Sequence, residues 1–406
     1  MPPSEIYNHR LLSARMVFSG GALKVKEADS EEGYGVRVLS DGRLGFSYCQ
    51  QFLGLEKAIK EAEALARFSP KSGFSFAPPA RFPEADVFDS ALAEPDFGML
   101  HAFLEDTRSA AESLGGKSRI ITSIDSAEVG ISNSGGLSGS YRKTVFSIFA
   151  ECMHGDGFGY SYLVSHHPPP DLHELGLRAA EMAKAMQGAG KPDGGSYTVV
   201  MEQEALDSLI ETLMPSLSGD WKRRKMTKLD KGMKLDPKLS IYEDPLSPPI
   251  NARPFDDEGV PSRKTPLIEN GDVKSFLYDR ETAALEGVQE SGACTRASFD
   301  SPPAISPSNT VIPPGDRKDL SDIGKFIEIH YAHGSHTANI TSGDIGLEVS
   351  GAFLVEGGKR RPVKGFLLSG NVFDLFSNIE GIESRQKQYG SLLAPRMAFR
   401  DVKIVS

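Results

Sequence analysis

The sequence predicts an α+β protein of two domains, each with a largely antiparallel sheet and a few helices, and with a strand-rich C-terminal domain. The chain has 406 residues, a length that favours two or more domains. Runs of β-forming residues separated by Gly, Asn and Ser recur along it, whereas helical periodicity is confined to a few stretches. Residues 187–196 (Gln-Gly-Ala-Gly-Lys-Pro-Asp-Gly-Gly-Ser) have the composition of a linker, which separates an N-terminal domain, residues 1–186, from a C-terminal domain, residues 197–406.

The N-terminal domain is expected to contain two sets of antiparallel strands. Within residues 36–50, two apolar runs flank Asp41-Gly42, which is a hairpin signal. Within residues 119–164, four β-type runs are separated by Gly, Ser and Asn, a pattern typical of an antiparallel meander. Residues 71–96 are rich in proline and are expected to be irregular.

Three helices are predicted before the linker, at residues 53–68, 97–114 and 173–186, because apolar residues recur there at helical spacing. Asp171 is the expected N-cap of the third helix. Glu174, three residues later, completes the spacing of a capping box.

The C-terminal domain is expected to begin with a strand at residues 197–201 and a helix at residues 204–214. Residues 216–265 are expected to be irregular. Residues 266–406 are strand-rich, and Asn270-Gly271 between alternating apolar residues is a strong hairpin signal.

Composition excludes several classes of protein. With Lys+Arg 45 and Asp+Glu 55 the net charge is −10, so direct binding to nucleic acid is not expected. The three cysteines, Cys49, Cys152 and Cys294, form no Cys-x-x-Cys pair and are too few for a disulfide framework. The N-terminal stretch resembles neither a signal peptide nor an anchor, and no apolar run approaches the length of a membrane span. We therefore expect a cytoplasmic protein with no membrane contact.

The order of several motifs identifies a family. Residues 253–265 read Arg-Pro-Phe-Asp-Asp-Glu-Gly-Val-Pro-Ser-Arg-Lys-Thr, and residues 339–344 read Asn-Ile-Thr-Ser-Gly-Asp. Residues 351–358 (Gly-Ala-Phe-Leu-Val-Glu-Gly-Gly) and 369–374 (Ser-Gly-Asn-Val-Phe-Asp) follow. This succession resembles the TldD/PmbA family, and specifically its TldE (PmbA) branch. The sequence departs from the family pattern at residues 290–293, where Glu-Ser-Gly-Ala stands in place of Ser-Thr-Gly-Asn.

The resemblance implies zinc chemistry in the family, but not in this chain. In TldD, His-Glu-x-x-x-His on the helix after the linker and a later cysteine bind the zinc ion. Here the corresponding helix, residues 204–214, has no histidine, and the corresponding hairpin, residues 351–362, has no cysteine. His173-Glu174 is not an alternative, because Arg178 occupies the position of the second histidine. We expect no cofactor on this chain and zinc in a TldD-like partner.

His330, His333 and His336 are a second candidate metal site, because imidazoles bind divalent metals. The segment before them alternates as a strand does. Alternation would place His330 and His333 on opposite faces, so shared coordination would require a special loop.

The acids Asp256, Asp257 and Glu258 are candidate cation ligands or general bases. The alternative is a solvated turn that pairs with Arg263 and Lys264. Because the acids and Arg263 lie in the strongest family match, we expect them to line a substrate cleft or an interface rather than to catalyse.

Asn339, Asp344 and Asn371 belong to the other family motifs. Asn and Asp beside glycine commonly form turns, yet the motifs also suggest contacts in a cleft or an interface. Residues 222–238 form a basic segment. This segment is either a solvated loop or a contact site for an acidic partner.

The resemblance implies a non-catalytic TldE-like subunit of a TldD/TldE-type zinc metallopeptidase, which shapes the dimer and the peptide cleft for proteolysis of unfolded peptides. The expected partners are a TldD-like subunit, a second copy of the chain when it is alone, and extended peptides. The alternatives are an autonomous metal-dependent hydrolase and a peptide- or protein-binding module. The second of these fits the family's older description as a modulator of DNA gyrase.

Overall fold

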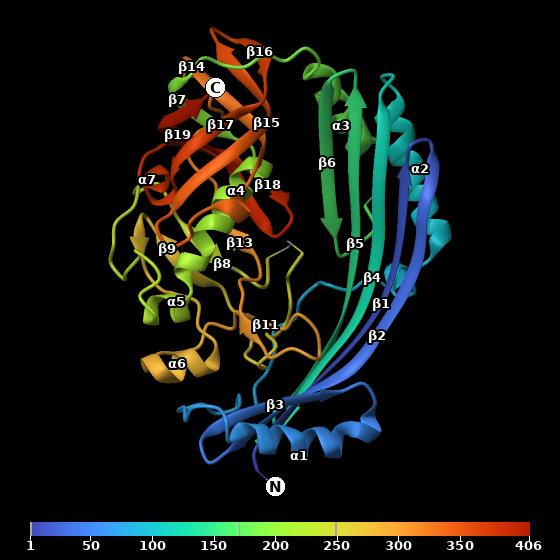
Figure 1. Ribbon diagram of the computed structural model, residues 1–406, viewed down its shortest axis with the longest axis vertical. Coiled ribbons are helices and arrows are strands. Elements are labelled where there is room, and N and C mark those ends of the chain that lie inside the picture. The colour runs from blue at the N-terminus through green and yellow to red at the C-terminus, as the bar shows by residue number, and fades with distance from the viewer. Residues whose placement is uncertain (1, 170, 248–249) are drawn as a thin grey trace.

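The computed structural model describes residues 2–169, 171–247 and 250–406, and its fold is built on two large sheets that lie side by side (Figure 1). The predicted α+β class with largely antiparallel sheets is confirmed. The first sheet has six strands in the order β3-β2-β1-β4-β5-β6, all antiparallel to their neighbours. Its strands are β1 (Ser4–Ser19), β2 (Ala22–Ser40), β3 (Arg43–Cys49), β4 (Lys117–Asn133), β5 (Ser138–His154) and β6 (Gly157–Ser165).

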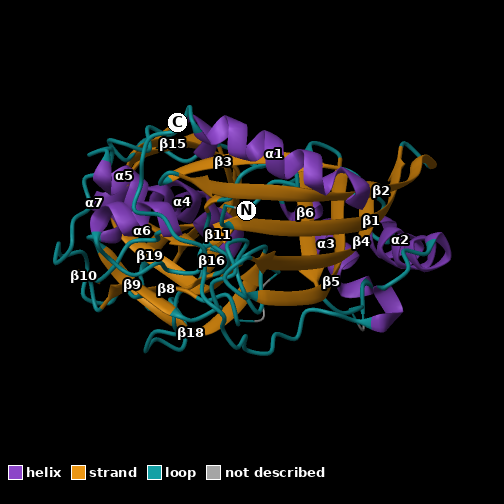
Figure 2. Ribbon diagram, turned by 90° about the horizontal axis from the view of Figure 1, so that it is seen from below, coloured by secondary structure: helices purple, strands orange, loops and turns teal. Residues whose placement is uncertain are grey.

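Three α-helices pack on the first sheet and agree with the predicted helices to within two residues at each end. They are α1 (Leu55–Ala66), α2 (Phe97–Glu112) and α3 (His173–Ala185). The 3-10 helices η1 (Phe52–Gly54) and η2 (Ser90–Leu92) precede α1 and α2. Helix α1 lies against β2 and β3, and α2 lies at the outer side of the sheet in both views (Figures 1 and 2).

Two local predictions for this part need correction. The four β-type runs of residues 119–164 form three long strands. The first two runs merge into β4, because the polar residues between them also pair with the neighbouring strands β1 and β5. Asp125, for example, accepts a hydrogen bond from Ser13 Oγ at 2.6 Å. The N-cap of α3 is Leu172, not Asp171. The carboxylate of Asp171 instead accepts a hydrogen bond from the backbone N–H of His173, at 2.9 Å.

The second sheet has eleven strands. Its main path is β10-β9-β8-β13-β19-β17-β15-β14-β7, and β16 and β18 pair with β15 and β19. Strand β7 pairs in parallel with β14 and antiparallel with β19, so five strands close on themselves. The strands are β7 (Gly195–Met201), β8 (Ile241–Glu243), β9 (Thr265–Glu269), β10 (Asp272–Val273), β13 (Thr310–Val311), β14 (Lys325–His333), β15 (Asp344–Glu356), β16 (Lys359–Val363), β17 (Phe366–Asn371), β18 (Ile379–Tyr389) and β19 (Leu392–Val405). A separate pair joins β11 (Cys294–Thr295) to β12 (Ala304–Ile305).

The helix predicted after the linker is α4 (Gln203–Leu213), which packs against β14 and β19. Its stripe of Leu206, Leu209, Ile210 and Leu213 is buried in the second core, as its spacing indicates. The other helices of this part are η3 (Met214–Leu217), α5 (Gly219–Arg223), α6 (Arg280–Glu286), η4 (Ser335–Thr337) and α7 (Val372–Phe376). The prediction that residues 216–265 are irregular was wrong for α5 and β8, which are too short to produce a periodic pattern.

Residues 187–196 connect α3 to β7, and the last two of them already belong to β7. Gly190 also forms an isolated parallel bridge with Val363. The division of the chain into two domains at this segment stays a prediction. Among the helices described, none is both long and apolar enough to cross a membrane.

Candidate functional site

A cleft of about 740 Å³ lies between the two parts of the chain. Strand β6 and helix α3 form one wall, and the N-terminus of α4 together with β14, β16 and β18 forms the other. The outer edge of β6 is joined to this second wall, because Tyr331 Oη bonds both backbone groups of Tyr160 and Gln388 Nε2 donates to the carbonyl of Val164. The cleft therefore exists only because the two sheets meet.

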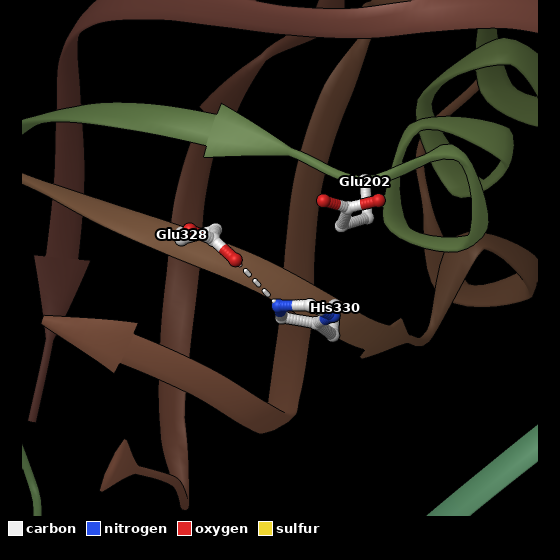
Figure 3. Close-up of side chains that lie close together, drawn as sticks. All are labelled: Glu202, Glu328 and His330. Atoms are coloured by element: carbon white, nitrogen blue, oxygen red, sulfur yellow. Dashed lines mark hydrogen bonds and ion pairs between the residues drawn. The ribbon is translucent and has the colours of Figure 1, made fainter. Parts of the chain in front are cut away.

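Two carboxylates and an imidazole come together beside the cleft (Figure 3). Glu202 is the N-cap of α4, directly after β7, while Glu328 and His330 lie two residues apart on β14 and therefore on the same face. Their ligand atoms all lie within 4.8 Å of one another, and His330 Nε2 is 2.7 Å from Glu328 Oε1. Such a set of oxygen and nitrogen donors can in principle hold a divalent metal.

Guanidinium groups already bind both of these carboxylates. Arg360 Nη2 donates to Glu328 Oε1 at 2.6 Å, and Arg396 Nη1 donates to Glu202 Oε1 at 3.1 Å. Burial tends to raise the pKa of Glu328, but the hydrogen bond from His330 and the charges of His330 and Arg360 outweigh it and lower this pKa. Arg396 also binds Glu383, and Lys387 Nζ lies 3.9 Å from Glu202 Oε2. Each of the two carboxylates thus already has a cationic partner, and the residues present do not fit a zinc ion.

Glu204, in the first turn of α4, lines the cleft without a hydrogen bond or ion pair among the residues described. Burial, and then the charge of Glu202, raise the pKa of Glu204 to about 8. At neutral pH the carboxyl group is therefore mostly protonated and can donate a hydrogen bond.

The rings of Tyr160 and Tyr331 form an aromatic wall of the same cleft. They are stacked, with 4.0 Å between the ring centroids.

The three histidines that the sequence suggested as a metal site do not meet in one ligand group. Only His330 belongs to the metal-capable group found in the described part of the chain. His333 Nε2 lies 3.1 Å from Ser350 Oγ, and His336 lies in η4.

The acids of residues 256–258 are buried rather than solvated, so the interpretation of a solvated turn was wrong. Arg37 donates to both carboxylate oxygens of Glu5, at 2.8 and 2.9 Å, and to Glu258 Oε1 at 2.7 Å. Arg296 Nη2 donates to Glu5 Oε1 at 3.0 Å, and its backbone N–H donates to Asp257 Oδ2 at 2.7 Å. This ionic network joins β1 and β2 to the second part of the chain.

The bases next to these acids have other partners. Arg263 donates to the carbonyl of Glu290, and Lys264 Nζ lies 4.1 Å from the ring centroid of Tyr242. The remaining acid, Asp256, accepts hydrogen bonds from the backbone N–H groups of Glu258 and Val260. None of the three acids, nor Arg263, is among the residues that line the cleft in the described part of the chain.

The structure brings Asn339, Asp344 and Asn371 together in one surface turn. Asn371 Nδ2 donates to Asp344 Oδ1 at 2.9 Å and to the carbonyl of Ser342 at 2.8 Å. Asn339 Oδ1 accepts a hydrogen bond from the backbone N–H of Ser342 at 3.0 Å. This turn also lies outside the lining of the cleft.

The basic segment is largely paired. Arg223 and Arg224 bind Asp220, Lys234 binds Asp272, and Lys228 Nζ donates to the carbonyl of Ser342 at 2.8 Å. Most of its basic side chains are nonetheless exposed to solvent, so the segment is a solvated region whose charges are largely paired.

Three models of one family together match most of the chain. The "PmbA/TldA metallopeptidase domain 1" matches residues 4–66, the "central domain" residues 86–187 and the "C-terminal domain" residues 194–406. The chain belongs to the PmbA/TldD metallopeptidase family. The first two models divide a single six-stranded sheet, since β1, β2 and β3 lie in the first model and the neighbouring β4, β5 and β6 lie in the second.

Known proteins agree with this assignment. An uncharacterised protein of Methanocaldococcus jannaschii is 29% identical over 91% of this chain and 88% of its own length. A metalloprotease of Methanothermobacter thermautotrophicus is 26% identical over 92% of this chain and 86% of its own length. The crystal structure of TldE from Thermococcus kodakarensis superposes with a TM-score of 0.90 at 22% identity, covering 100% of this chain and 97% of that one, which shows a shared fold.

Sequence reasoning missed Glu202, Glu204 and Arg360, which line the cleft, and Glu328 and Arg396, which lie beside it. Glu202 follows the predicted strand, residues 197–201, and Glu204 begins the predicted helix, residues 204–214. This position at a strand-to-helix junction was the available signal.

Proposed function

We propose that this chain is the metal-free, TldE-type subunit of a two-subunit peptidase of the TldD/TldE kind. A TldD-like partner supplies the zinc ion and the hydrolytic chemistry. This chain supplies interface surface and one wall of a cleft that holds unfolded or extended peptides. It forms a homodimer when the partner is absent, and it acts in the cytoplasm.

One observation carries this proposal. The resemblance implies that the zinc ligands of TldD come from the helix after the linker and from the C-terminal hairpin. In this chain both corresponding segments border the cleft, the helix through Glu204 and the hairpin through Phe353 and Arg360. The same segments have no histidine on α4 and no cysteine in residues 351–362. The nearby carboxylates are bound by Arg360 and Arg396. The chain therefore has a cleft where TldD has its zinc site, but the polar groups of this cleft suit contacts with a peptide rather than with a metal ion.

The cleft offers complementary groups to a peptide backbone. Arg178 and Lys387 are cations that can bind carbonyl oxygens or a terminal carboxylate, and the protonated Glu204 can donate a hydrogen bond. Tyr160 and Tyr389 supply flat surfaces for apolar side chains. These residues bind and orient a peptide and perform no proton transfer.

The polar residues of the family motifs have a separate role in this proposal. Asn339, Asp344 and Asn371 form the surface turn described above, and Arg263 lies near the buried acids 256–258. We assign the turn and Arg263 to the subunit interface. Asp256, Asp257 and Glu258 hold the framework behind it.

The test measures metal content and peptidase activity of the chain alone, of a TldD-like partner with an intact His-Glu-x-x-x-His, and of the mixture. We expect no stoichiometric zinc and no cleavage of an unfolded peptide by the chain alone, and full activity only in the mixture. Arg178→Ala should lower activity of the mixture at least tenfold without removing zinc from the partner. Arg10→Ala, an exposed arginine on β1, is the matched control and should have no effect.

Three results would overturn the proposal: zinc on the isolated chain that survives mild chelation, cleavage by the isolated chain, or full activity of the partner alone. Binding of peptide by the mixture without cleavage would instead support a binding module.

A second candidate function, an autonomous metal-dependent hydrolase, has one observation in its favour, the donor group of Glu202, Glu328 and His330. If it is correct, the isolated chain binds a divalent metal, and Glu328→Gln and His330→Ala each abolish that binding. Metal binding that persists in both variants would exclude this group.

A further inference from the structure

A second, smaller pocket lies next to the cleft, further along α4. Its volume is about 330 Å³. Glu204 of α4 lines the cleft, and Asp207, three residues later, lines this pocket. In the same way Gly390 lines the cleft and the next residue, Ser391, lines the pocket. The two cavities are therefore neighbours along one helix and one turn.

The polar side of the pocket has an unbalanced negative charge. Asp207 and Glu211 are four residues apart on α4 and so lie on the same face. Neither has an ion pair within the described residues, and the hydrogen bond of Glu211 is from Ser335 Oγ at 2.8 Å. Burial, and then the charge of Glu211, raise the pKa of Asp207 to about 7. No lysine, arginine or histidine is among the described residues that line the pocket.

Apolar side chains form much of the rest of the pocket, which is also lined by Ser218, Ser306, Thr310 and Ser391. Ile210, Met214, Leu277 and Leu392 are buried core residues that form its floor. Trp221 forms part of its wall, and the electron-rich face of an indole attracts organic cations. A volume of this order lies at the lower end of small-ligand pockets, which suits one side chain rather than a whole peptide.

We propose that this pocket receives an alkylammonium or guanidinium group on an apolar stem, which in a peptide is the side chain of lysine or arginine. The stem packs on the apolar floor, and the cation lies between the carboxylates of Asp207 and Glu211 and the indole of Trp221. The placement of a peptide in the neighbouring cleft rests on the proposed function. The binding of a cation in the pocket is independent of that function.

Trp221 is the only tryptophan of the chain, so its fluorescence reports directly on this pocket. The isolated chain is titrated with pentylammonium chloride, with pentanol, and with magnesium chloride. We expect a saturable change with pentylammonium and none with the other two. A saturable response to magnesium, or equal responses to pentylammonium and pentanol, would overturn the proposal.

Variants locate the effect. Asp207→Asn and Glu211→Gln should each weaken pentylammonium binding at least tenfold, whereas Glu63→Gln, the same change at an exposed position of α1, should leave it unchanged. Asp207 has no hydrogen bond or ion pair within the described residues, so its variant should fold, and circular dichroism checks this. Unchanged binding in both pocket variants would contradict the proposal.

The source of the cation is tested with peptides. A capped extended pentapeptide with a central lysine should bind more tightly than pentylammonium, and its acetyl-lysine counterpart should bind at least tenfold more weakly than the lysine peptide. Tight pentylammonium binding with no lysine preference in peptides would restrict the pocket to free amines and overturn its role in peptide selection. If the two-subunit mixture shows no peptidase activity while the isolated chain still binds pentylammonium, the proposed function fails and the cation site stands.

Discussion

At the scale of single residues, Glu204 shows how position alone changes chemistry. The residue lies in the first turn of α4, where a carboxylate would ordinarily be favoured by the helix dipole. Burial, and then the charge of Glu202, outweigh that effect and the opposing charges of Arg178 and Lys387, and they raise the pKa of Glu204 to about 8. Its neutral form is therefore favoured in the folded protein.

This shift predicts a pH-dependent effect of Glu204→Gln. Because the folded pKa lies above the unfolded value of about 4.3, stability associated with the protonated group is complete below pH 4 and is lost as pH rises through about 8. The variant should match the parent near pH 4 and be more stable at pH 9, by on the order of 5 kcal/mol. Urea unfolding at both pH values measures this, and equal stability at pH 9 would contradict the shift.

At the scale of elements, glycines let helices approach strands closely. A Cβ atom added at Gly159 of β6 would lie 2.5 Å from the backbone carbonyl of Ala179 in α3, and one added at Gly45 of β3 would lie 1.9 Å from the carbonyl of Ala62 in α1. The small residues Ala179 and Ala62 on the helices complete these contacts. Backbone atoms cannot yield as a flexible side chain can, so the spacing of helix and strand depends on the glycines.

We therefore predict that Gly159→Ala destabilises the chain by about 1–3 kcal/mol, because it forces α3 away from β6. Gly346→Ala in β15 is the control, since nothing lies within 4 Å of its added Cβ and its φ is not positive. Thermal unfolding of both variants tests the contact. A Gly159→Ala variant as stable as the Gly346→Ala variant would show that α3 can shift without cost.

At the scale of the whole molecule, the first sheet is joined to the second part by a buried ionic network. Arg37 and Glu5 lie on adjacent strands of the sheet, whereas Glu258 and Arg296 come from the second part. All four side chains are at most 3% exposed. In such surroundings the removal of one charge leaves its partners uncompensated.

Arg37→Ala should therefore cost about 3–5 kcal/mol, because the buried carboxylates of Glu5 and Glu258 both lose this partner and Glu5 keeps only Arg296. Arg10→Ala removes an exposed pair with Glu32 and should cost less than about 1 kcal/mol. Chemical denaturation compares the two. If Arg37→Ala is no more disruptive than Arg10→Ala, the network does not hold the two parts together.

The sequence by itself determined the local elements. The spacing of Leu206, Leu209 and Leu213 was sufficient to predict helix α4. The pair Asn270-Gly271 was sufficient to predict the turn between β9 and β10, and both residues have positive φ in the structure. These features depend on neighbours within a few residues, so chain order alone encodes them. The motifs of residues 253–265 and 339–344 also identified the family, because their order along the chain is itself the signal.

Only the tertiary structure decided which distant residues meet. Glu202 and Arg396 are 194 positions apart, and they are joined because β7 pairs with β19. The burial of Asp256, Asp257 and Glu258 likewise depends on a sheet formed some 200 residues earlier in the chain, and local composition indicated the opposite. Burial and pairing across such separations follow from the packing of whole sheets, for which no local spacing rule exists. The cleft and its charges were therefore decided by the fold.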